Sequence, residues 1–141
     1  MASDDTWSMA TGDDDGTPLI FRVRNNPPAF ATKDSFRHLL AVTWEYEPDN
    51  EQGMPSRDVI ERMAQFEDLL TPAFEDVRQA FLTVVVTGNG AREWQWYARN
   101  DDQTMELVNE ALGEYETFPV QFSFQDDPAW EGYSRFQEVT R

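Results

Sequence analysis

The chain has 141 residues, of which 11 are basic and 27 acidic, and its net charge of −16 argues against nucleic acid and anionic membranes as partners. It contains no cysteine, which excludes disulfides, thiolate zinc sites and cysteine nucleophiles. It shows neither a secretory signal nor a run of about eighteen apolar residues, so we expect a cytoplasmic protein. Its length favours a single domain spanning residues 1–141, with residues 1–6 flexible.

The N-terminal part of the chain predicts a β-hairpin. Two short apolar-rich runs, Trp7 to Thr11 and Pro18 to Arg24, flank the sequence GDDDG, whose glycines and aspartates are typical of a turn. Tandem prolines follow and cannot donate hydrogen bonds to a sheet, so residues 25–35 are expected to form a surface connection. The sequence does not indicate where this hairpin joins the rest of the fold.

A change of apolar period separates the next strand from a helix. In HLLAVTWEYE, residues 38–47, every second residue from Leu40 to Tyr46 is apolar, which predicts a strand. After Ser56 the apolar residues recur every three or four positions and predict an amphipathic helix with Ser56 as its N-cap. We expect Pro72 to kink or end this helix, with a further helical segment continuing to about Ala80.

Residues 81–99 predict a second hairpin. The run FLTVVVTGN is rich in β-branched residues, and Asn89 with Gly90 favours a tight turn. The returning strand places Trp94 and Trp96 on one face. We expect both rings to seal the sheet against helices rather than to stack on a ligand.

The last third of the chain predicts a helix, a strand and a short helix. The first helix is expected to have its N-cap at Asp101 or Asp102 and to end at Gly113. PVQFSFQ alternates as a half-buried strand. In the terminal helix, Asp127 is expected to be the N-cap and Pro128 the first helical residue.

The order of these elements predicts an α+β fold. After the first hairpin, the β-α-β-β-α-β order is typical of the ferredoxin-like unit, in which two helices cover one face of an antiparallel sheet. We therefore expect a two-layer, ferredoxin-like βαββαβ sandwich with an extra N-terminal β-hairpin and a short C-terminal helix. Its other face would be open, polar and acidic, and would carry Thr43, Glu45, Glu47, Glu93, Gln95, Tyr97, Gln121 and Ser123.

Catalytic patterns are not evident in the sequence. The single histidine, His38, is interpreted as a strand-end residue with no identifiable partner. Carboxylate pairs such as Glu45 with Glu47, and Asp126 with Asp127, are expected by chance among 27 acidic residues. We predict no metal site and no cofactor, and the sequence favours a non-enzymatic protein.

Three stretches resemble the bacterial family called domain of unknown function 695 (DUF695): TGNGAREWQWYAR, DDPAWEGY and the upstream GMPSRDVIERMAQFEDLL. The resemblance covers the chain from Trp7 onward and includes no enzymatic signature. Some members of that family are joined to a module similar to the B-type regulator of ribonuclease E, an acidic inhibitory protein. By analogy, the resemblance implies a regulatory, protein-binding function. The most recognisable positions are Arg92, Trp94, Tyr97, Asp127, Pro128, Trp130 and Tyr133.

Two functional hypotheses remain open. In the first, the domain binds a basic protein through its acidic sheet face and regulates an RNA-processing enzyme. In the second, it is a small-molecule-binding domain or a small hydrolase, with a site between the 87–92 turn and the 127–133 segment and with Arg92 as an anion anchor. The simpler alternative for Arg92 is a rim arginine that stacks on Trp94 or pairs with an acid. Together the hypotheses give these candidate binding residues: Arg92, Tyr97, Asp127, Trp130, Tyr133, Glu45 and Glu47.

Overall fold

The computed structural model describes residues 6–14, 16–115 and 117–140. Of the segment 1–6 that we expected to be flexible, only Thr6 lies within these residues. The strands and helices, in chain order, are β1 (Trp7–Asp14), β2 (Thr17–Arg24), β3 (His38–Glu45), α1 (Arg57–Glu75), β4 (Ala80–Gly88), β5 (Ala91–Ala98), α2 (Asp101–Leu112), β6 (Val120–Asp126) and α3 (Glu131–Val139).

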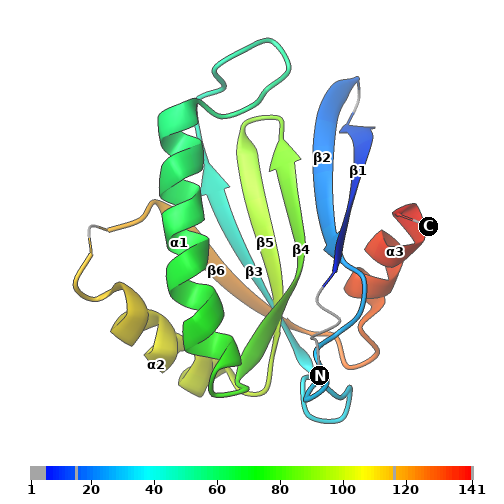
Figure 1. Cartoon of the computed structure of the whole chain (residues 1–141), viewed down its shortest axis with the longest axis vertical. Coiled ribbons are helices and arrows are strands. Elements are labelled where there is room, and N and C mark those ends of the chain that lie inside the picture. The colour runs from blue at the N-terminus through cyan, green and yellow to red at the C-terminus, as the bar shows by residue number, and fades with distance from the viewer. Residues whose placement is uncertain (1–5, 15, 116, 141) are drawn as a thin grey trace.

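The six strands form one antiparallel sheet in the order β1-β2-β4-β5-β3-β6 (Figure 1). The N-terminal hairpin extends this sheet, because β2 pairs with β4 and places Phe21 opposite Val86. Strand β3 lies between β5 and β6, which makes β1 and β6 the two edge strands.

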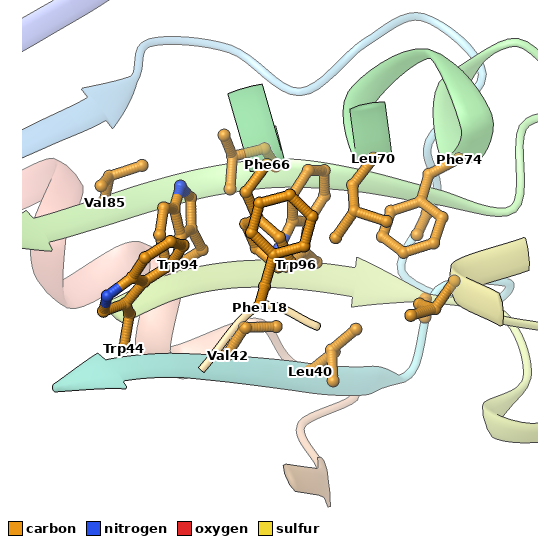
Figure 2. Packing of buried hydrophobic residues seen from close by; sticks show 14 of the residues in the cluster. Leu40, Val42, Trp44, Phe66, Leu70, Phe74, Val85, Trp94, Trp96 and Phe118 are labelled. Carbon is orange, nitrogen blue, oxygen red and sulfur yellow. The ribbon is translucent and has the colours of Figure 1, made fainter. Parts of the chain in front are cut away.

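Helices α1 and α2 pack against one face of the sheet (Figure 1). Trp94 and Trp96 on β5 are completely buried there, which confirms that the two rings seal the sheet. Phe66 of α1 packs on Trp94 with ring centroids 5.0 Å apart, and Phe74 packs edge-on against Trp96 at 4.9 Å. Figure 2 shows this first core, which includes Leu40, Val42, Trp44, Phe66, Leu70, Phe74, Val85, Trp94, Trp96 and Phe118.

The opposite face carries a second core beneath α3 and the connection between β2 and β3. Phe36 from that connection packs edge-on against Phe81 of β4, with centroids 5.3 Å apart. A β-bulge between Leu82 and Val84 shifts the alternation of β4, so that Val84 joins Phe81 on this side. The second core comprises Val23, Phe36, Leu39, Phe81, Val84, Tyr97, Trp130 and Tyr133.

The predicted two-layer, ferredoxin-like sandwich is therefore wrong, although the fold is α+β. The structure has a six-stranded antiparallel sheet with helices on both of its faces. The hairpin adds two strands beside β4. Phe81 and Tyr97 form an apolar surface on the second face, and Trp130 and Tyr133 pack on it. Tyr97, which we expected on an open polar face, is completely buried.

The start of α1 is as predicted, whereas its end is not. The Ser56 hydroxyl accepts a hydrogen bond from the Val59 N–H at 3.3 Å and caps the helix. Pro72 lies inside the helix, which ends at Glu75 rather than near Ala80. The left-handed backbone of Arg78, with φ of 57°, is incompatible with a helix that continues through this position.

The N-cap of α2 is Asn100, one residue before the two aspartates that we predicted. Its side-chain oxygen accepts a hydrogen bond from the Gln103 N–H at 3.0 Å. Asp101 and Asp102 instead occupy the first turn, where the helix dipole favours acidic side chains. Within the described ranges, no helix has the length and apolar character needed to cross a membrane.

Candidate functional site

The residues that the sequence singled out divide between the two faces of β5. Tyr97 points to the α3 side and joins Asp127, Trp130 and Tyr133 there. Arg92 points to the α1 side, in phase with the buried tryptophans of the first core. The small-molecule hypothesis requires Arg92 to converge with Asp127 and Tyr133. In the structure Arg92 lies on the other face of the sheet and does not converge with them.

Asp127 links β5 to the start of α3. The Tyr97 hydroxyl donates to Asp127 Oδ2 at 2.6 Å, and the backbone N–H groups of Glu131 and Gly132 donate to its two oxygens at 2.9 and 3.0 Å. The carboxylate of Asp127 therefore binds the first N–H groups of α3, but the N-cap position is Trp130, so the prediction of Asp127 as N-cap is wrong. The helix itself starts at Glu131, because Trp130 takes a left-handed conformation with φ of 57°, and Pro128 lies outside it.

Asp127 and Tyr97 each have one protonation state at neutral pH. Burial by itself would raise the pKa of Asp127, but the hydrogen bonds from Tyr97, Gly132 and Glu131 outweigh burial and lower that pKa below its usual value. Burial, and then the hydrogen bond to Asp127, raise the pKa of Tyr97. At neutral pH the carboxylate is charged and the phenol protonated, so the pair is an anchor and not a proton relay.

Trp130 and Tyr133 complete this anchor. The Trp130 indole N–H donates to the Phe36 carbonyl at 2.7 Å, and the Tyr133 hydroxyl donates to the Arg24 carbonyl at 2.6 Å. Both side chains are buried. Tyr97, Asp127, Trp130 and Tyr133 therefore hold α3 on the sheet and present little surface to a ligand.

Arg92 lies over a tryptophan, as the simpler alternative for this residue proposes. Its guanidinium carbon is 5.8 Å from the centre of the Trp94 ring, and its Nε donates to Thr87 Oγ1 at 2.8 Å. Burial, and then the charge of Arg22, lower the pKa of Arg92. An arginine remains protonated at neutral pH despite such a shift.

The other titratable candidates are dispersed. Glu45 and Glu47 are exposed at the end of β3 and beyond it, and Asp126 is exposed beside the buried Asp127. His38 has partners that the sequence did not reveal, because they come from distant segments: its Nδ1 lies 3.3 Å from Asp101 Oδ1 and 3.4 Å from Asp126 Oδ1. Among the described residues, no group of three or more histidines and carboxylates is positioned to hold a metal ion.

Helix α3 leaves part of the second face uncovered, and this area forms a depression of about 370 Å³. We call it the sheet platform. Phe136 of α3 borders the depression and packs on Phe21, with ring centroids 5.5 Å apart. The platform is lined by Leu19, Phe21, Thr43, Val86, Gly88, Asn89, Ala91, Glu93, Gln95 and Phe136.

The strand register arranges the platform as a row that changes from apolar to acidic and polar. Phe21 of β2 lies opposite Val86 of β4, and Val86 lies opposite Glu93 of β5. Glu93 in turn lies opposite Thr43 of β3, and Thr43 lies opposite Gln121 of β6. Val86 and the Glu93 carboxylate are therefore direct cross-strand neighbours on one surface, and Phe21 lies one strand further away.

Gln95 holds the Glu93 carboxylate of the platform in place. Its Nε2 donates to Glu93 Oε2 at 2.7 Å, which fixes both side chains. Its Oε1 is buried and accepts no hydrogen bond from any residue that the structure describes. Because this oxygen is enclosed, a ligand on the platform surface meets the Glu93 carboxylate that Gln95 holds in place, and not Oε1 itself.

Gln95 also borders a second depression, of about 240 Å³, which continues along α3. Arg135 and Glu131 of α3 line this second depression together with Gln125 of β6. The sequence placed Glu93 and Gln95 on the open face through their alternation. It contained no signal for the unpaired oxygen or for the contribution of Phe21 and Phe136.

The model of the Family of unknown function (DUF695) matches residues 5–137. The chain belongs to this family. The resemblance found in the sequence is thus confirmed, and the matched range includes the sheet platform and the Asp127 anchor. A comparison with curated proteins gave no match. Membership of DUF695 does not identify an activity, so a function has to be argued from the geometry.

Proposed function

We propose that this member of DUF695 is a non-enzymatic module that binds a basic segment of another protein on the sheet platform. The observation that carries the proposal is the Glu93 carboxylate, held in place by Gln95 beside the apolar strip of Phe21 and Val86. The absence of cysteine from the sequence is compatible with the reducing cytoplasm, where we propose that the protein acts.

An arginine side chain matches this arrangement. Its apolar stem can lie on Phe21, Val86 and Phe136, while its guanidinium donates to the Glu93 carboxylate that Gln95 holds in place. The net charge of −16 favours encounter with a basic segment and makes association sensitive to salt. Exposed Glu45, Gln121 and Ser123 extend the polar side of the platform and offer further acceptors.

The geometry gives less support to an enzyme. The best-aligned titratable pair, Tyr97 with Asp127, is buried and committed to holding α3. Among the described platform residues, the only charged side chain is Glu93, which has no histidine or second carboxylate beside it on the platform. Acid–base chemistry requires groups that converge on a reacting atom.

Fluorescence anisotropy with labelled peptides tests the proposal. One short peptide alternates leucine with arginine, and its control carries citrulline in place of arginine. We expect salt-sensitive binding of the arginine peptide and at least about tenfold weaker binding of the citrulline peptide. Glu93→Gln and Gln95→Leu are each expected to weaken binding of the arginine peptide by about tenfold.

Glu110→Gln is the matched control, because Glu110 is an exposed carboxylate on α2, on the opposite face. It removes the same charge as Glu93→Gln and is expected to change affinity less than about twofold. The proposal would be contradicted if the arginine peptide failed to bind. Equal weakening of its binding by Glu93→Gln and Glu110→Gln would also contradict the proposal. Sedimentation of the protein alone provides the other check: self-association that Glu93→Gln abolishes would assign the platform to a second copy of the chain instead.

A further inference from the structure

Arg92 presents a fixed guanidinium whose outer nitrogens have no partner among the residues that the structure describes. Its Nε is held by Thr87 Oγ1 at 2.8 Å, and its carbon lies over the Trp94 ring. Within residues 6–14, 16–115 and 117–140, Nη1 and Nη2 of Arg92 make no hydrogen bond or ion pair, and neither is a buried atom. The orientation of the guanidinium is thus set by two contacts that do not use its outer nitrogens, and the residue is half-buried.

The nearby carboxylate does not neutralise Arg92. Glu67 of α1 is bound to Arg22, whose Nη1 donates to Glu67 Oε2 at 3.1 Å, and the Trp94 indole N–H donates to Glu67 Oε1 at 2.9 Å. One carboxylate therefore faces two guanidinium groups. Arg22 and Arg92 together carry two positive charges beside the single negative charge of Glu67.

We propose that Arg92 binds a carboxylate group, at a site on the face opposite to the sheet platform. The two outer N–H groups of a guanidinium form parallel hydrogen bonds that match the two oxygens of a planar carboxylate. A single unpaired arginine suits one negative charge better than the two of a phosphate, which the chain's net charge of −16 repels more strongly. The carboxylate can belong to a small free acid or to the C-terminus of a polypeptide.

Titration with sodium acetate at constant ionic strength, followed by NMR, tests the site. We expect saturable shifts of the Arg92 Nε–H and Trp94 indole N–H signals. Arg92→Lys keeps the positive charge but removes the two parallel N–H groups of the guanidinium. Thr87→Val removes the contact that orients Arg92. Each variant is expected to weaken acetate binding by at least about tenfold. Arg57→Lys is the control, because the Arg57 side chain is 92% exposed and pairs with Glu61 rather than with Thr87 or Trp94.

Two further binding measurements identify the source of the carboxylate. A tripeptide with a free C-terminus that binds at least about tenfold tighter than acetate, while its amide does not bind, assigns the site to a polypeptide C-terminus. Equal affinity for acetate and the tripeptide assigns it to a small acid. The proposal is overturned if acetate produces no saturable shift, if Arg92→Lys leaves the shift unchanged, or if inorganic phosphate binds more tightly than acetate.

Discussion

The hydroxyl of Tyr97, on β5, donates a 2.6 Å hydrogen bond to the carboxylate of Asp127, which also accepts the first N–H groups of α3. One carboxylate thus joins the centre of the sheet to the helix that covers its second face. Because Asp127 is buried and Tyr97 fully so, water cannot easily replace any of these hydrogen bonds.

We predict that Asp127→Asn lowers the free energy of unfolding by about 2–4 kcal/mol, because the amide loses the charge and turns one acceptor into a donor. Urea denaturation followed by circular dichroism measures this change. The adjacent Asp126, whose side chain is 87% exposed, supplies the control, and Asp126→Asn is expected to change stability by no more than about 0.5 kcal/mol. Similar losses in the two variants would show that the Asp127 anchor contributes little.

Alkaline pH is predicted to destabilise the fold through the second core. Burial raises the pKa of Tyr133 to about 12, and it also raises the pKa of Tyr97. Between the unfolded value of about 10 and these higher values, the native state binds more protons than the unfolded state, so stability falls as pH rises. Tyr133→Phe is expected to reduce the steepness of this fall. Denaturant midpoints measured from pH 8 to 12 for the native chain and the variant test the prediction, and parallel curves would contradict it.

Local features of the fold could be predicted from the sequence. Turn residues between two runs of strand-forming residues predicted each hairpin, and the alternation after Gly90 predicted the burial of Trp94 and Trp96. The change of period at Ser56 predicted α1 with its cap. These features depend on residues close together in the chain, so their physical causes are visible in a short window.

The arrangement of the elements could not be predicted in the same way. The attachment of the first hairpin depends on pairing between Phe21 and Val86, which are distant in sequence. In addition, the alternation of apolar residues along a strand does not say which face of the sheet those residues will lie on. The bulge after Leu82, which turns Val84 to the second core, has no distinctive residue. The same limit applies to the candidate site: Phe136 of α3 borders the platform and packs on Phe21 of β2, which is distant in sequence.

The two central tryptophans are predicted to respond differently to replacement by phenylalanine. Both are fully buried, but the Trp94 indole N–H donates to Glu67 at 2.9 Å, whereas the Trp96 N–H is buried with no acceptor in the described part of the chain. Trp94→Phe removes a hydrogen bond, while Trp96→Phe removes an unsatisfied donor. We expect Trp96→Phe to be less destabilising than Trp94→Phe by about 1–2 kcal/mol in urea denaturation. A larger loss for Trp96→Phe would indicate that its N–H bonds to an internal water.

The last prediction concerns ion pairs of contrasting burial. Arg24 is 5% exposed, and its Nη2 lies 3.2 Å from Glu75 Oε1 while its Nη1 donates to the Leu82 carbonyl at 3.2 Å. Arg24→Met is expected to cost about 2–4 kcal/mol of unfolding free energy, because it leaves a carboxylate and a carbonyl unpaired under α1. Arg57 pairs with Glu61 across side chains that are 92% and 68% exposed, so Arg57→Met should cost no more than about 0.5 kcal/mol. Denaturant unfolding of both variants at low and high salt separates the two cases, because water already screens the exposed pair. Of the two pairs, only Arg24–Glu75 joins β2 to α1.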